Sequence, residues 1–283
     1  MGFFRELIKL TRFEHALMLA LGVLISETIV IGRLPPSEYY ILLSLLVPIF
    51  SEMGSFALND YFDIETDRLN KKTDRPLVKG TISPGFAMGF SVLSILLSIL
   101  LAYLINQTVF IIALIFNLLG IAYNWRLKDL PLIGNAYIAL TMSIPFIFGN
   151  FVVATQLSQL AFILALLGFV AGLAREIIKS VQDMRGDAVA RNSKTLPLII
   201  GKKPAIIMAV VLYLFFIPLS AWPFTLGLSI SFVPISMIAT ADVLILAICY
   251  KMITYPDKSF GFARNISLVA FLLGMLGLLV AVL

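Results

Sequence analysis

Apolar runs separated by short polar segments make up almost the whole chain. These runs cover residues 13–32, 38–60, 84–105, 108–125, 132–154, 159–181, 204–222, 231–250 and 264–282. A run of about 20 residues is long enough for an α-helix to cross the hydrocarbon core of a bilayer. Since 60% of residues are hydrophobic and 13% are charged, the pattern predicts an all-α membrane protein. We expect nine transmembrane helices in one bundle around a central cavity.

The basic residues indicate how the chain is oriented. Every Lys and Arg except Arg33 lies before the first run or around the end of an even-numbered run. The positive-inside rule then places the N-terminus in the cytoplasm and the C-terminus outside. We expect a single domain over 1–283 of a multi-pass cell-membrane protein, with cytoplasmic loops near 61–83 and 183–203. The net charge of +5 suits an anionic inner leaflet better than nucleic acid.

Two acidic clusters stand at the cytoplasmic ends of the second and sixth runs. Asn59, Asp63 and Asp67 have helical i, i+4, i+8 spacing, and Asp183 and Asp187 repeat the i, i+4 spacing. On a helix, each set forms a stripe along one side. A carboxylate near the bilayer interior costs on the order of 2.5–3.5 kcal/mol, and like charges at this spacing repel. These groups therefore require a counter-charge.

A divalent cation supplies such a counter-charge. Amide and carboxylate oxygens are hard ligands, and Mg²⁺ commonly completes its coordination with substrate phosphate. Arg75, Arg175 and Lys179 are then suited to contact phosphate oxygens. The residues thus predict a Mg²⁺-bridged diphosphate at the cytoplasmic mouth of a membrane cavity. The single His15 cannot form a histidine metal site, and the single Cys249 implies no disulfide.

Other interpretations of the acidic clusters have to be weighed against this one. Either cluster alone would most often be a polar helix end that faces water. Intramembrane acids also mark routes for ion or lipid transport. A transport route needs polar residues across the membrane, and the outer halves of the second and sixth runs almost lack them. A membrane scaffold without catalytic activity would not require acidic residues at this helical spacing.

The motifs resemble those of a known family. The stretch "NDYFDIETD" has the pattern NDxxDxxxD, and the "D" before "MRGD" completes DxxxD. Further similar stretches are "DRPL", "YNWRLKDLPLIGN" and "REIIKSVQDMRGDAVARNSKTLPLIIG". Over the whole chain they resemble the UbiA superfamily of intramembrane prenyltransferases. The resemblance implies that two Mg²⁺ ions hold an isoprenyl diphosphate between the clusters. Its diphosphate departs, and an acceptor captures the allylic cation-like group.

The resemblance also implies roles for individual residues. The expected metal ligands are Asn59, Asp63, Asp67, Asp183 and Asp187. The expected contacts to the substrate diphosphate are Arg75, Lys128, Lys179 and Lys194, although the last could merely dock its loop. The expected catalytic residues are Asp63, Asp183, Tyr123 and Lys128. Asp60 lies about 100° away from the stripe. We expect Asp60 and Glu52 to orient the residues that hold the metal or the diphosphate, without contacting the ligand themselves.

The acceptor is the least determined part of the prediction. The segment around the second motif is most similar to the branch of the family that transfers a geranylgeranyl group from its diphosphate to geranylgeranylglyceryl phosphate in ether-lipid biosynthesis. That acceptor's phosphate needs further basic residues, and those available are Arg126, Arg185, Arg191, Lys202 and Lys203. The stretch "FEH" in the first run instead resembles the aromatic-acid branch, so a 4-hydroxybenzoate-type enzyme of quinone biosynthesis is the alternative. Nothing in the sequence sets the donor chain length or the oligomeric state.

Overall fold

The described residues form helices and no strand. The computed structural model describes residues 2–36, 38–69, 71–191 and 194–283, without the side chains of 185–187 and 189–191. The long helices are α2 (Phe13–Ile31), α3 (Tyr39–Phe62), α6 (Pro84–Tyr103), α7 (Gln107–Trp125), α8 (Ile133–Val153), α9 (Gln159–Arg191), α11 (Lys202–Ser220), α13 (Phe232–Thr254) and α14 (Pro256–Val282). The short ones are α1 (Gly2–Thr11), α4 (Ile64–Leu69), α5 (Pro76–Lys79), η1 (Leu127–Asp129), α10 (Leu196–Ile200) and α12 (Trp222–Thr225).

The predicted spans are confirmed. In the described part of the chain, nine helices are long and apolar enough to cross a membrane, one for each predicted run. Two boundaries differ from the prediction. Helix α14 begins at Pro256 rather than near 264, with proline in the first turn, where its missing N–H is tolerated. Helix α9 continues through Arg191, so the second acidic motif lies on a helix and the loop expected near 183–203 is shorter.

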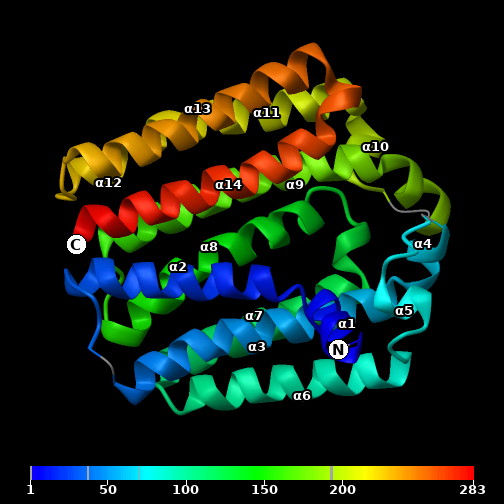
Figure 1. The fold of residues 1–283 in the computed structure, drawn as a ribbon, viewed down its shortest axis with the longest axis horizontal. Coiled ribbons are helices and arrows are strands. Elements are labelled where there is room, and N and C mark those ends of the chain that lie inside the picture. The colour runs from blue at the N-terminus through cyan, green and yellow to red at the C-terminus, as the bar shows by residue number, and fades with distance from the viewer. Residues whose placement is uncertain (1, 37, 70, 192–193) are drawn as a thin grey trace.

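The contacts of the long helices close into a ring, and Figure 1 shows these helices side by side. Helix α2 packs against α3 and α8, α3 against α6, α6 against α7, and α8 against α9. The second half continues from α9 to α11, α13 and α14, and α14 packs back on α2 and α9. Short helices α4, α5 and α10 gather at one end, and the C-terminus lies at the other (Figure 1). We call the end with α4, α5 and α10 the motif end.

Glycines allow α8 to pack closely between α2 and α9. A Cβ atom on Gly149 would lie 2.6 Å from the carbonyl oxygen of Val23, and one on Gly168 would lie 2.5 Å from that of Met142. Any larger residue would separate these helices, and small residues are the usual means of close approach in membranes. Of the nine spans, α9 is the most buried, so the second motif stands on a central helix.

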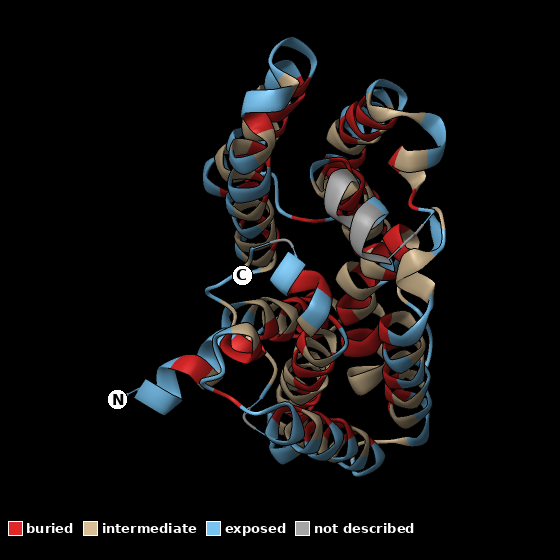
Figure 2. Cartoon of the chain, turned by 90° about the vertical axis from the view of Figure 1, so that its right-hand side faces the viewer, coloured by how far each residue is buried: buried red, intermediate tan, exposed pale blue. Residues whose placement is uncertain are grey.

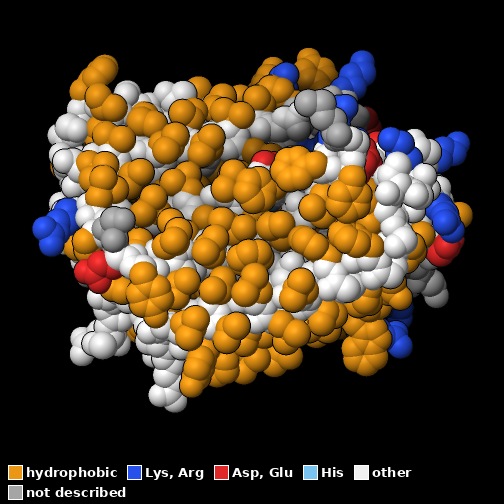
Figure 3. All heavy atoms as spheres, turned by 60° about the horizontal axis from the view of Figure 1, so that its bottom comes forward, with side chains coloured by type: hydrophobic (Ala, Val, Ile, Leu, Met, Phe, Trp, Pro, Cys, Tyr) orange, Lys and Arg blue, Asp and Glu red, His pale blue; other side chains and the backbone are white. Residues whose placement is uncertain are grey.

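The outside of the ring is apolar. Buried residues face inward and exposed ones outward (Figure 2). The exposed side chains include many large hydrophobic ones, such as Leu93, Phe162 and Val243. On the face drawn in Figure 3, hydrophobic side chains cover the middle, and Lys and Arg lie toward the ends. A surface of this kind is stable in lipid and not in water, so the chain is a multi-pass membrane protein.

Candidate active site

A cavity of about 590 Å³ lies inside the ring. At the motif end its wall carries polar side chains from α3, α4, η1 and α9: Asn59, Asp63, Asp67, Lys128 and Asp183. Farther in, its wall is mainly apolar and includes Phe146, Leu164, Phe216, Ile238 and Leu278. A cavity with a charged mouth and an apolar interior matches a ligand with a charged head and a hydrocarbon tail.

The first acidic motif spans the junction of α3 and α4. Asp63 stands between the two helices, with φ −98° and ψ 3°. The Asp63 N–H donates to the Asn59 carbonyl at 3.0 Å, and the Asp67 N–H donates to the Asp63 carbonyl at 2.7 Å. These bonds keep the i to i−4 pattern of an α-helix across the junction. All three side chains line the cavity, so the stripe expected from the spacing persists although the helix is interrupted.

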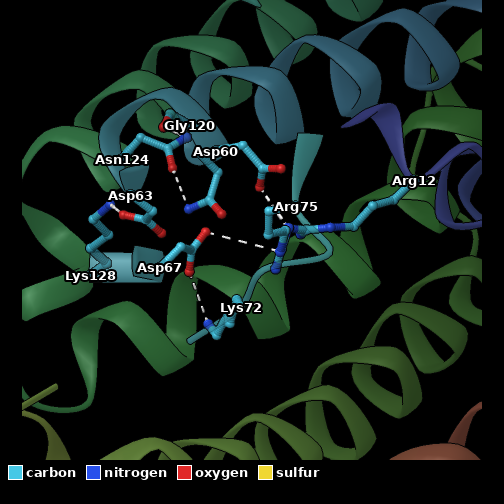
Figure 4. Close-up of polar contacts among 10 residues, drawn as sticks. Arg12, Asp60, Asp63, Asp67, Lys72, Arg75, Gly120, Asn124 and Lys128 are labelled. Carbon is cyan, nitrogen blue, oxygen red and sulfur yellow. Dashed lines mark hydrogen bonds and ion pairs between the residues drawn. The ribbon is translucent and has the colours of Figure 1, made fainter. Parts of the chain in front are cut away.

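The basic residues near the first motif pair with its carboxylates (Figure 4). Lys128 Nζ lies 2.5 Å from Asp63 Oδ1, and Lys72 Nζ lies 3.1 Å from Asp67 Oδ1. Arg75 Nε lies 4.0 Å from the other oxygen of Asp67. Burial raises the pKa of Asp67, while the Lys72 ammonium group opposes that change. The mouth of the cavity is thus a network of alternating charges.

Asp60 joins two arginines behind this network. Its side chain is 1% exposed, and its Oδ1 accepts hydrogen bonds from Arg12 at 2.8 Å and Arg75 at 2.7 Å. Arg12 has a left-handed backbone, with φ 43°, between α1 and α2, and its guanidinium lies 4.2 Å from the Phe56 ring centroid. Asp60 therefore positions Arg75 at the cavity wall. The sequence marked Arg12 only as a basic residue before the first span.

Asn59 is held by a second asparagine. Its Nδ2 donates to Asn124 Oδ1 at 2.9 Å, and Asn124 Nδ2 donates to the Gly120 carbonyl at 3.0 Å. Because the side-chain nitrogen of Asn59 makes this bond, its side-chain oxygen Oδ1 is oriented to accept a cation. Asn124 was not predicted, although it follows Tyr123 within one of the motif stretches. Asn59, together with Asp63 and Asp67, gives the mouth hard oxygen donors of the kind that Mg²⁺ prefers.

The second motif meets the first at the same cavity. Asp183 lines the wall from α9, and α4 packs against α9. The side chain of Asp187 lies outside the described residues. Among those described, no three His, Cys, Asp or Glu side chains gather closely enough to hold a metal ion by themselves. Asp63, Asp67 and Asp183 bring carboxylate oxygens to one cavity, and Mg²⁺ commonly completes a few such protein ligands with ligand phosphate.

Three of the remaining predicted site residues line the cavity: Glu52, Tyr123 and Lys179. The Tyr123 ring stacks on Tyr137 with centroids 4.8 Å apart, and Lys179 Nζ lies 3.0 Å from Glu176 Oε1.

Lys194 is placed differently from the other predicted diphosphate contacts. It is exposed and is absent from the cavity wall. Its backbone N–H donates to the Asp129 carbonyl at 3.2 Å, which docks the chain before α10 on η1.

Comparison with known proteins gives the class of this fold and site. The chain matches the UbiA prenyltransferase family over residues 19–269. It is 34% identical to a digeranylgeranylglyceryl phosphate synthase of Archaeoglobus fulgidus, over 95% of this chain and 92% of the relative. The fold and the cavity thus define a membrane-embedded prenyltransferase. The chain belongs to the UbiA prenyltransferase family, and the resemblance predicted from the motifs is confirmed.

Solved structures share the fold over nearly the whole chain. One, described as digeranylgeranylglyceryl phosphate synthase in membranes, has a TM-score of 0.77 and 26% identity, and the match covers 100% of this chain and 99% of the other. A second, a UbiA homolog from Archaeoglobus fulgidus bound to GPP and Mg²⁺, has a TM-score of 0.70 and 21% identity. That match covers 96% of this chain and 99% of the other.

Proposed function

We propose that the protein transfers a geranylgeranyl group from its diphosphate to geranylgeranylglyceryl phosphate, in a Mg²⁺-dependent step of ether-lipid biosynthesis. One observation carries the proposal: the first acidic motif and Asp183 of the second line the mouth of a single cavity whose interior is mainly apolar. Such a cavity accommodates a diphosphate head at the mouth and an isoprenoid tail within. The similar synthase of Archaeoglobus fulgidus supports the choice of acceptor.

Oxygen donors at the mouth would hold the metal. We assign this role to Asn59, Asp63, Asp67, Asp183 and Asp187. A Mg²⁺ ion held by these residues would supply the positive charge that stabilises a departing diphosphate. A UbiA homolog from Archaeoglobus fulgidus has been solved bound to GPP and Mg²⁺, which supports the choice of this metal.

The chain's own basic residues would complete the diphosphate site. Arg75, Lys128 and Lys179 line the cavity and would donate hydrogen bonds to the phosphate oxygens, and such charge-assisted bonds strengthen as negative charge develops. The bond between the isoprenyl C1 and its oxygen breaks, and the electron pair leaves with the diphosphate. The acceptor hydroxyl forms the new C–O bond, and its proton passes to the released diphosphate. The Tyr123 ring would face the transient positive charge, and the apolar wall would exclude water.

The orientation in the membrane belongs to the same proposal. We infer that the motif end faces the cytoplasm, with the N-terminus on that side and the C-terminus outside, in the cell membrane. The distribution of Lys and Arg along the chain supports it. The packing of α14 on α2 also supports treating residues 1–283 as one domain.

One assay tests the proposal. The purified protein is incubated with Mg²⁺ and geranylgeranyl diphosphate, with geranylgeranylglyceryl phosphate and 4-hydroxybenzoate in parallel, and product masses are measured. We expect the diether product, and no product when geranylgeranyl monophosphate replaces the diphosphate. A prenylated hydroxybenzoate as the main product would instead favour the aromatic branch. One observation that fits the aromatic branch is that His15, from the "FEH" stretch, lines the cavity.

A further inference from the structure

Two arginines on the cavity wall have no carboxylate partner among the side chains that the structure describes. Seven described Lys and Arg side chains line the cavity: Arg12, Lys72, Arg75, Lys128, Arg175, Lys179 and Arg264. Five of them pair with Asp60, Asp63, Asp67 or Glu176. Arg175 and Arg264 form no ion pair with any side chain that the structure describes. They therefore differ from the other basic residues of the site.

Both arginines belong to the wall where α9 meets α14. Arg175 Nε donates to Ser267 Oγ at 3.2 Å, and Ser267 Oγ donates to the backbone carbonyl of Arg264 at 3.0 Å. Because Ser267 is fully buried, its contact with Arg175 fixes the position of α14 along α9. Arg264 lies three residues before Ser267, on the same side of α14. The neighbouring Asn265 also lines the cavity.

This wall is separate from the acidic mouth. Arg175 precedes Asp183 by two helical turns, which is roughly 12 Å along the axis of α9. Lys179 stands between them and is paired with Glu176. Helix α14 carries none of the acidic motif residues. The separation suits two different anionic groups, one at the mouth and one deeper, rather than a single diphosphate.

Both arginines lie on the cavity wall, Arg175 half-buried and Arg264 exposed, and a partly buried guanidinium such as that of Arg175 is costly without an anion beside it. The guanidinium fork matches the oxygens of a phosphate and binds them through two parallel hydrogen bonds. We propose that Arg175 and Arg264, with Asn265, bind the phosphate of the glycerol phosphate acceptor and so direct its free hydroxyl toward the donor. This inference rests on the proposed function and names the part of the site that selects its acceptor.

The test compares the acceptor with an uncharged analogue. Rates of Arg264→Gln, Arg175→Gln and wild type are measured with geranylgeranylglyceryl phosphate and with geranylgeranylglycerol, which lacks the phosphate. We expect the KM for the phosphate acceptor to rise about tenfold or more in each variant, as for the loss of a charge-assisted hydrogen bond. The KM for geranylgeranyl diphosphate and the rate with the uncharged acceptor should stay at the wild-type values.

Two controls separate binding from folding. Arg264 makes no side-chain hydrogen bond to a described residue, so its replacement removes charge without removing a structural contact. Arg175→Lys keeps the charge and should retain part of the affinity. Arg33→Gln changes an exposed arginine that is absent from the cavity wall and should leave both KM values unchanged. The acceptor alone, without Mg²⁺ or donor, should raise the Tm of wild type and not of Arg264→Gln.

The outcomes are distinguishable. A rise in the donor KM alone would assign the arginines to the diphosphate, and unchanged KM values would remove them from substrate binding; either result overturns the inference. In both cases wild type still forms the diether, so the proposed function stands. If wild type prenylates only 4-hydroxybenzoate, the proposed function fails, and the assignment of these arginines to an acceptor phosphate fails with it.

Discussion

Lys128 pairs with Asp63 across 65 positions of sequence, with 2.5 Å between Nζ and Oδ1. Both side chains are largely buried, at 8% and 12% exposed. The pair joins η1 to the junction of α3 and α4 at the mouth of the cavity. A diphosphate bound there would offer Lys128 a second anion, and a metal ion would offer Asp63 a second cation. The same two residues are thus placed to contact both partners of the proposed reaction.

Removal of a motif carboxylate should abolish transfer. We expect Asp63→Ala and Asp183→Ala to lower the rate by about a hundredfold or more, because each loses a ligand that stabilises the departing diphosphate. Product formation and Tm are measured together, and Tm should show that the variants still fold. Glu65→Ala is the matched control, since this acid belongs to the first motif stretch and its side chain is 79% exposed. Equal losses in all three variants would contradict the assignment.

The reaction should depend on divalent metal. Treatment with a chelator is expected to remove transfer, and added Mg²⁺ is expected to restore it, because the mouth supplies oxygen donors that need a cation to bind diphosphate. Rates are measured before and after dialysis, with Tm as a check on the fold. A wild-type rate in metal-free buffer would exclude the proposed role of the carboxylates.

Asp60 should matter for stability as well as for activity. Asp60→Ala leaves Arg12 and Arg75 without their shared buried acceptor, and loss of one partner of a buried ion pair costs about 3–5 kcal/mol. We expect Asp60→Asn to cost less, because its amide oxygen still accepts a hydrogen bond. Unfolding in detergent measures both variants. An Asp60→Ala protein as stable as wild type would show that these ion pairs contribute little.

Substitutions of Tyr123 separate its ring from its hydroxyl group. If the ring stabilises the allylic cation, Tyr123→Phe should keep most of the rate and Tyr123→Ala should lose on the order of tenfold. The stack on Tyr137 should survive in the Phe variant. The kcat of each variant is compared at saturating donor. A Phe variant as slow as the Ala variant would point to the hydroxyl group.

The contact between Glu6 of α1 and Thr81, in the segment after α5, should depend on pH. A hydrogen bond from Thr81, at 3.0 Å, is the main reason that the pKa of Glu6 is lowered. Since the folded state then binds the proton more weakly than the unfolded state, Glu6 stabilises the fold above its unfolded pKa, and this contribution is lost as pH falls through the lowered value. Glu6→Gln should therefore lower Tm at neutral pH. The difference from wild type should disappear in acid; a constant difference would mean that charge is not involved.

The pattern of apolar runs and the spacing of the acidic residues were sufficient for the spans and for the acidic stripe. The thickness of the bilayer determines how long a crossing helix must be, so runs such as 84–105 predict α6 almost to the residue. Helical periodicity likewise placed Asn59, Asp63 and Asp67 on one side. Both are local properties, because they depend only on the rise and turn of one helix.

The partners of the charged groups were decided by the tertiary structure. Arg12 reaches Asp60 across 48 positions, and no periodicity in either span indicates that they meet. Spacing tells which side of a helix a residue occupies, and it says nothing of which helix faces that side. Contacts between helices set that order, as where Gly149 and Gly168 bring α8 close to α2 and α9. The packing of α14 on α9 places Arg175 and Arg264 on one wall.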